Sequence, residues 1–138
     1  MSGKSSYLED QLLNWMKGTT FVAPTTNVYV ALFTTAPADD GTGYVEVSGG
    51  SYARVAMARS SSWSAITGGT APHQISNNGV ITFPTATANW GTVISVGTFD
   101  IATLGSGNLL YWQTISGQTI NTGVVASFAI GTLVVSED

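Results

Sequence analysis

The residues of this chain that could do chemistry are a few scattered acids. Asp39 and Asp40 precede Gly41 in the loop Ala36–Gly43, as acids do in calcium loops, but further oxygen ligands at EF-hand spacing are missing. Paired carboxylates also hydrolyse glycosidic bonds. The acids from which such a pair could be drawn are Asp39, Asp40, Glu46 and Asp100. Because most of them lie in predicted turns, where carboxylates bond the local backbone, we expect neither a metal site nor a catalytic pair.

The single histidine and the one glycine-lysine-serine sequence also lack the partners that catalysis needs. His73 follows Pro72 in a predicted exposed loop, without the serine, carboxylate or thiolate of a triad or a three-ligand metal site. Gly3-Lys4-Ser5 lacks the preceding strand and glycine loop that would cradle a phosphate. The chain has no cysteine, which excludes disulfides and thiolate sites. We predict that this protein is not an enzyme and holds no cofactor.

Charged residues make up only 9% of the 138 residues, against about 25% in ordinary soluble domains. Such a surface suits a protein that is covered by other subunits, the alternative being a rigid extracellular-type β domain. The four basic residues cannot form the stripe that nucleic acid requires, and the net charge is −4. No apolar run approaches the roughly 20 residues of a membrane span. We expect one domain over residues 1–138, with no nucleic-acid or membrane partner.

The elements that position these residues begin with a predicted helix at about residues 6–17. Ser5-Ser6 followed by Glu9 resembles a capping box with Ser6 as the N-cap, and Gly18 is a natural stop. The apolar residues recur at helical spacing on one stripe, and they are Leu8, Leu12, Leu13, Trp15 and Met16. We expect this stripe to pack on the protein's own sheet. The alternative is a helix that docks on a neighbouring subunit.

The rest of the chain alternates short apolar runs with turn signals, which predicts about eight strands. Asn27–Thr34 and Leu109–Ile115 are apolar on both faces, as strands buried on both sides are. Thr85–Gly91 should carry the chain from one sheet to another. Val124–Val135 is predicted as the last and longest strand, with Gly131 at a bulge or corner. The fold class is therefore all-β, an antiparallel, jelly-roll-like β-sandwich with one N-terminal α-helix.

A hairpin is predicted where Ser48-Gly49-Gly50 joins Tyr44–Val47 to Ser51–Met57. Alternation places Tyr52 and Arg54 on the face away from Val55 and Met57. An arginine among small and aromatic residues needs an acidic or carbonyl partner. The favoured reading is an ion pair with Glu46 across the hairpin, and the alternative is a contact with another subunit.

Several segments resemble one family of small structural proteins from tailed bacteriophages. These are Thr25–Thr35 (TTNVYVALFTT), Glu46–Arg54 (EVSGGSYAR), Ile81–Gly91 (ITFPTATANWG), Gly107–Leu110 (GNLL) and Ser127–Leu133 (SFAIGTL). The similarity covers nearly the whole chain in the same order. Members are described as head decoration or cement proteins, tail-fibre proteins or minor tail proteins, and the shared motifs include no catalytic residue.

The resemblance implies a non-enzymatic virion protein. The favoured function is that of a capsid decoration (cement) protein, a homotrimer on the capsid surface that binds the major capsid protein and stabilises the head. The alternative is a tail-fibre, baseplate or minor tail component used in tail assembly or host binding. A third reading is a carbohydrate-binding module with Trp63 or Trp90 as a stacking platform. The residues that we expect to contact a partner are Lys4, Tyr7, Asp39, Asp40, Tyr52 and Arg54.

Overall fold

The structure is a computed structural model that describes residues 2–70 and 72–137, so residues 1, 71 and 138 of the expected domain lie outside it. The described part contains ten strands and one helix. In chain order they are β1 (Ser2–Lys4), α1 (Ser6–Met16), β2 (Asn27–Thr35), β3 (Val45–Glu46), β4 (Val55–Ala58), β5 (His73–Ser76), β6 (Ile81–Thr82), β7 (Gly91–Phe99), β8 (Leu109–Ile120), β9 (Ser127–Phe128) and β10 (Val134–Glu137). The helix is too short to span a membrane, and the described residues contain no longer one.

The main sheet has six strands in the order β1-β8-β7-β2-β3, with β4 also paired to β2, and every pairing is antiparallel. Strand β2, which lies between β7 and the edge strands β3 and β4, is buried on both faces, as its sequence predicts. Val30 and Leu32 belong to one apolar cluster, while Ala31 and Phe33 belong to a second. This alternation shows that the sheet carries a core on each side.

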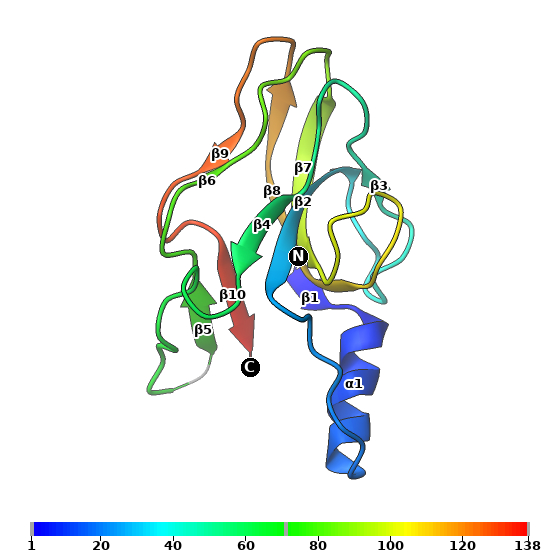
Figure 1. Cartoon of the computed structure of the whole chain (residues 1–138), viewed down its shortest axis with the longest axis vertical. Coiled ribbons are helices and arrows are strands. Elements are labelled where there is room, and N and C mark those ends of the chain that lie inside the picture. Colours follow the sequence, from blue (N-terminus) through cyan, green and yellow to red (C-terminus); the bar gives the residue numbers. More distant parts are fainter. Residues whose placement is uncertain (1, 71, 138) are drawn as a thin grey trace.

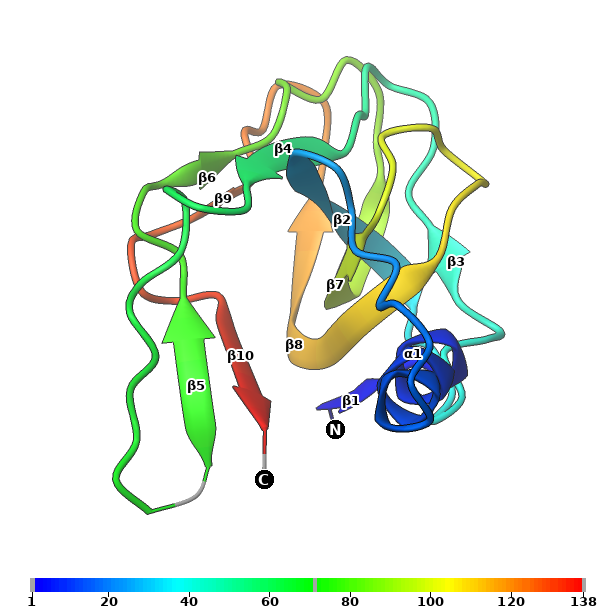
Figure 2. The same cartoon turned by 60° about the horizontal axis from the view of Figure 1, so that its bottom comes forward.

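The two-stranded sheets β6-β9 and β5-β10 lie beside one another over one face of the main sheet (Figures 1 and 2). Ile81, Phe83 and Leu133 from this layer share a cluster with Val30 and Leu32 of the main sheet. The fold is therefore a sandwich-like all-β arrangement, as expected. The segment between β6 and β7 does carry the chain from one sheet to the other, and Pro84 lies two residues after the end of β6.

Three strand predictions are wrong, and long-range pairing is the reason in each case. β3 and β4 do not pair as a hairpin, because both pair with β2 as two parts of one interrupted edge. β8 continues through Ser116 and Gly117, beyond the predicted end of the strand at Ile115, because β7 pairs along it as far as Ile120. Val124–Val135 is not one strand. β9 pairs with β6, β10 pairs with β5, and Gly131 lies between them in a left-handed turn with φ +77°.

The helix α1 forms where predicted, but its cap and its packing differ from the prediction. The N-cap is Ser5, not Ser6, and its hydroxyl accepts from the Leu8 backbone N–H at 3.3 Å. At the other end, Gly18 has φ +89° and its N–H donates to the Trp15 carbonyl, as in a Schellman stop. Within α1, all of which the structure describes, Leu8 is the one buried residue. The expectation that the apolar stripe packs on the protein's own sheet is therefore wrong.

Candidate functional site

The start of α1 and two loops meet at one end of the main sheet around an open groove of about 580 Å³. Its lining comes from residues 5–7, 40–44 and 107–109, and we call it the helix-start groove. Tyr7 and Asp40, two of the residues expected to contact a partner, lie in this lining. Asp39 is exposed in the same loop, next to Asp40. The structure thus brings three of the six predicted contact residues to one place.

Ser5 joins the helix to the sheet at the base of the groove. It is buried, its backbone N–H donates to the Leu110 carbonyl at 2.9 Å, and its hydroxyl donates to the Leu109 carbonyl. Gly41 packs so closely that a Cβ there would lie 2.6 Å from the Ser5 Cβ. Since Gly41 also has φ +81°, a side chain at this position would be both strained and obstructed. The groove therefore has a fixed base.

Asp40 gives the groove a negative charge. Its Oδ1 accepts from the Thr42 hydroxyl at 2.7 Å and from the Thr42 backbone N–H at 2.9 Å. The hydroxyl bond, followed by the backbone bond, lowers the pKa of Asp40 below its ordinary value of 3.8. The Asp40 backbone carbonyl accepts from the Ser6 N–H at 3.0 Å, which ties this loop to the first turn of α1.

Arg54 is buried and holds the loop that forms the other side of the groove. Its Nη1 donates to the carbonyls of Ile101 at 2.9 Å and Ser106 at 3.0 Å. Its Nε and Nη2 donate to the two carboxylate oxygens of Glu46 at 2.8 and 2.7 Å. The predicted ion pair with Glu46 is confirmed. It does not cross a hairpin, because β3 and β4 each pair with β2 and not with one another.

Asp100 fixes the same loop from its base. Its two carboxylate oxygens accept from the backbone N–H and the side-chain amide of Asn108, each at 2.7 Å. Arg54 and Asp100 together hold residues 101–106 from below and leave Ile101 and Leu104 at the surface. This loop is thus preorganised, so a partner would bind it without a large cost of ordering.

Tyr52, also expected to contact a partner, is buried in the core and bonded within the chain. Its hydroxyl donates to Glu46 Oε1 at 3.1 Å and accepts from the Leu32 backbone N–H at 2.9 Å. Burial raises the pKa of Tyr52. Trp90 packs edge-on against it, with ring centres 5.3 Å apart, and donates to the Gly50 carbonyl. Tyr52 and Arg54 therefore support the surface from buried positions. A direct contact between either residue and a partner stays a prediction.

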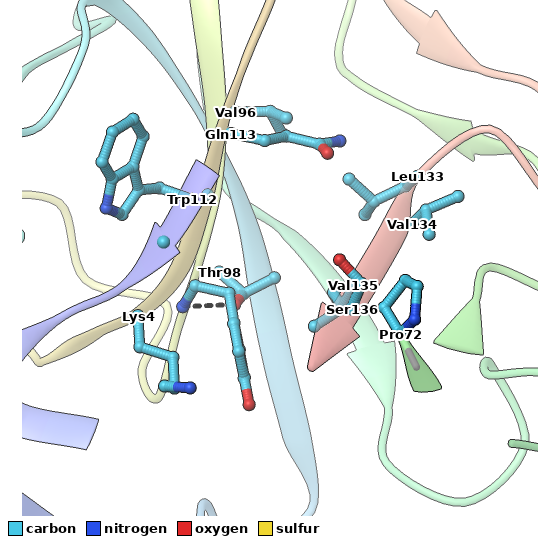
Figure 3. A pocket seen from close by; sticks show the side chains of 13 residues that line it. Lys4, Pro72, Val96, Thr98, Trp112, Gln113, Leu133, Val134, Val135 and Ser136 are labelled. Carbon is cyan, nitrogen blue, oxygen red and sulfur yellow. Dashed lines mark hydrogen bonds between the residues drawn. The ribbon is translucent and has the colours of Figure 1, made fainter. Parts of the chain in front are cut away.

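Lys4 faces a different region from Tyr7 and Asp40. It lies beside a cavity of about 200 Å³ between β1, β8 and β10 (Figure 3). Its Nζ lies 2.7 Å from Glu137 Oε2, and the other Glu137 oxygen accepts from the Tyr111 hydroxyl. Burial, followed by this bond to Glu137, raises the pKa of Tyr111. These contacts connect the first and last described strands.

The described residues offer surfaces for binding and no recognisable catalytic centre. Among them, no three His, Cys, Asp or Glu side chains lie close enough to hold a metal ion. His73 is exposed as expected, but it begins β5 and does not lie in a loop. Trp90 is buried and Trp63 is half-buried against the core, so neither presents the open ring face that a stacking platform needs.

Sequence reasoning named a helix that docks on a neighbouring subunit only as the alternative for α1, and the exposure of its apolar stripe in the structure is compatible with that alternative. Comparison with known proteins adds one match. A family model described as Gp80, podophage GP4 fiber I protein gp80, matches residues 3–136. No curated protein matches the chain. The match spans every segment on which the resemblance to phage structural proteins rests.

Proposed function

Since the chain belongs to the Gp80 family of podophage fiber proteins, it is a structural protein of a bacteriophage virion, and we propose that it is a non-enzymatic component of the particle's fiber. The description of the family carries this proposal. The structure supports it through a low-charge β fold that presents a preorganised groove. The role is mechanical, because the surface binds other virion proteins.

The helix-start groove is the surface that we assign to this attachment. Ser5 and Gly41 fix its base, Asp40 supplies a negative charge, and Arg54 holds the loop at residues 101–106. A groove held in this way presents Tyr7 and the Asp40 carboxylate at constant positions. We expect the partner surface to carry an apolar or aromatic contact for Tyr7 and a basic group opposite Asp40.

A capsid decoration role is the second candidate, favoured by the very low charge of the chain. In this role a homotrimer would bind the major capsid protein at the junctions between capsomers. Many polar contacts, each weak alone, would add through multivalency. The groove would then face the shell.

Locating the protein on purified virions by cryo-electron microscopy tests both candidates. Density at a fiber supports the first candidate, and density on the shell alone overturns it in favour of the second. The groove itself is tested with Tyr7→Ala, which should reduce incorporation into particles while the purified protein stays folded. Gln118→Ala, at an exposed position of β8, is the matched control. Equal incorporation of the two variants would exclude the groove as the attachment surface.

A further inference from the structure

The cavity of about 200 Å³ between β1, β8 and β10, which we call the inter-sheet cavity, has a floor made by the main sheet. The register pairs Val96 of β7 with Gln113 of β8, and Thr98 and Tyr111 lie two residues from them on the same strands. Because side chains alternate along a strand, these four residues share the face that is turned toward β10. Figure 3 shows the Gln113 amide on this side of the sheet and the Trp112 ring on the other side.

Two polar side chains that line the inter-sheet cavity have unused capacity for hydrogen bonds. Gln113 is half-buried, and no described residue bonds its side-chain amide, although its backbone carbonyl accepts from the Ser95 hydroxyl. Thr98 is buried, and its oxygen accepts from the Tyr111 N–H at 3.4 Å, while no described residue accepts its hydroxyl proton. Buried polar groups in proteins are normally bonded to the chain, to water or to a ligand. The cavity therefore suits a molecule that both donates and accepts hydrogen bonds.

The charged groups beside the cavity compensate one another. Among the described residues that line it, Lys4 carries the one charge, and its Nζ lies 2.7 Å from Glu137 Oε2. The second oxygen of Glu137 accepts from the Tyr111 hydroxyl. A phosphate, carboxylate or ammonium group would need an excess of the opposite charge next to it, because removing an ion from water without a partner is costly. The pairing thus favours a ligand without a net charge.

Apolar side chains line the same cavity. Leu133, just before β10, and Val135 within it contribute from the small sheet, and Val96 contributes from the main sheet. A ligand must then expose carbon–hydrogen surface to these residues as well as polar groups to Gln113 and Thr98. The volume of about 200 Å³ lies below the roughly 300–1,000 Å³ of sites for drug-sized ligands. The cavity therefore has room for one ring and not for a chain of rings.

A pyranose has each of these properties. Its hydroxyl groups donate and accept hydrogen bonds, its ring carbons present an apolar C–H surface, and an unmodified sugar has no charge. We propose that the inter-sheet cavity binds one neutral sugar unit, a hexose at the end of a glycan, whose hydroxyl groups bond the Gln113 amide and the Thr98 hydroxyl. This binding function does not rest on attachment through the helix-start groove, because the two linings share no residue.

NMR titration of the purified chain with free sugars tests the site. The probes are the methyl glycosides of glucose, galactose, mannose, rhamnose and N-acetylglucosamine. We expect at least one of them to bind with a dissociation constant on the order of millimolar, because one ring and a few neutral hydrogen bonds are buried. The amide signals of Tyr111, Gln113 and Val135 should shift, and those of Tyr7 and Asp40 in the helix-start groove should not. No shift with any of the five glycosides, or shifts confined to the groove, would overturn the proposal.

Two further probes test the class of the ligand. Glucose 6-phosphate should bind more weakly than methyl glucoside, because the cavity has no excess of positive charge for the phosphate. Acetamide, a model of an asparagine side chain, should cause smaller shifts than the sugars at equal concentration. Tighter binding of the phosphate would contradict a neutral ligand. Shifts from acetamide that match those of the best glycoside would assign the cavity to a side chain of a partner protein and overturn the sugar site.

Substitutions of similar volume test the two polar residues. Gln113→Leu and Thr98→Val each remove the hydrogen bonds that the side chain would make to a sugar, so each should weaken binding by about three- to tenfold. Gln118→Leu on β8 and Thr92→Val on β7 make the same changes at exposed positions of the same strands and should leave binding unchanged. Circular dichroism verifies that each variant is folded. Wild-type affinity in both cavity variants would exclude the proposed contacts.

Filling the cavity gives a test that does not depend on those hydrogen bonds. Thr98→Val also removes the acceptor of the Tyr111 N–H, so a variant that leaves this bond in place is needed. Val135→Phe adds a ring to the lining, and it should abolish binding while the melting temperature shows a folded chain. A folded Val135→Phe protein that binds the glycosides with wild-type affinity would show that the sugar does not enter the inter-sheet cavity.

Discussion

The guanidinium carbon of Arg54 lies 3.6 Å from the centre of the Phe99 ring. Phe99 is fully buried and is the last residue of β7. The guanidinium of Arg54 therefore packs where β7 of the main sheet ends and the loop at residues 100–108 begins. The same guanidinium donates to Glu46 and to two carbonyls of that loop. One side chain therefore ties the interrupted edge, the second core cluster and the groove together.

Arg54→Met should destabilise the protein by about 3–5 kcal/mol, because it leaves the buried Glu46 carboxylate without its cation. The Glu46 side chain is only 9% exposed. Adding Glu46→Gln to this variant should recover part of the loss, since the buried charge is then removed. Urea unfolding followed by fluorescence measures both changes. An Arg54→Met protein with a wild-type midpoint would show that the ion pair contributes nothing net.

Ser5→Ala should cost about 1–2 kcal/mol, the usual effect of losing an N-cap. It removes the hydroxyl that bonds both Leu8 and the Leu109 carbonyl. Ser6→Ala is the neighbouring control, because Ser6 is the N-cap that the sequence alone suggests and is not the N-cap in the structure. Hydrogen exchange at the Leu8 amide should become faster in Ser5→Ala alone. Equal effects of the two substitutions would contradict the observed cap.

Asn77→Ala should destabilise the protein by several kcal/mol, because each buried polar group left without a partner costs about 1–3 kcal/mol. The Asn77 side chain is buried, accepts from the Leu133 N–H at 2.9 Å, and donates to the carbonyls of Gly79 and Ala129. Asn78→Ala next to it removes one bond at an exposed position and should cost much less. Thermal unfolding compares them. Similar melting temperatures would rule out a central role for Asn77.

Asn77 also explains why the last part of the fold could not be predicted. The run Val124–Val135 has the composition of a strand. However, the hydrogen bonds from the Asn77 side chain to Ala129 and Leu133 divide this run into two segments, and the two segments join different sheets. These bonds connect residues more than fifty positions apart. A pattern of neighbouring residues in the sequence cannot predict hydrogen bonds over such a separation. The Asn77-Asn78-Gly79 sequence indicates the turn. It does not indicate that the side chain of Asn77 hydrogen-bonds to residues far away in the sequence.

The sequence predicts β2 and α1 well because their patterns are local. Apolar residues on both faces of Asn27–Thr34 require cover on both faces, and the structure supplies it. The helical spacing from Leu8 to Met16 likewise defines an apolar stripe. It cannot state which molecule covers that stripe, because amphipathicity requires a partner without identifying one. The interrupted edge at Glu46 and Val55 was missed for a related reason, since the choice of β2 as their partner is long-range.

Acid should weaken the fold around Asp40 through its carboxylate. Because the pKa of Asp40 is lower in the folded chain than its ordinary value of 3.8, folding favours the ionised form. Its contribution to stability is then present above about pH 4, and it is lost as the pH falls through the folded pKa. Thr42→Val removes the hydroxyl bond, the larger cause of the lowering. The pKa of Asp40 should therefore rise toward 3.8 in this variant.

Carboxyl chemical shifts measured by NMR between pH 2 and pH 6 follow this pKa directly. Thr92→Val removes an exposed hydroxyl that bonds Thr119, far from Asp40 in the sequence, and should leave the titration unchanged. In Thr42→Val the backbone N–H of residue 42 still donates to Asp40, so a part of the lowering should remain. If the Thr42→Val and wild-type titrations coincide, the Thr42 hydroxyl does not stabilise the ionised Asp40 carboxylate, and the low pKa of Asp40 has another cause.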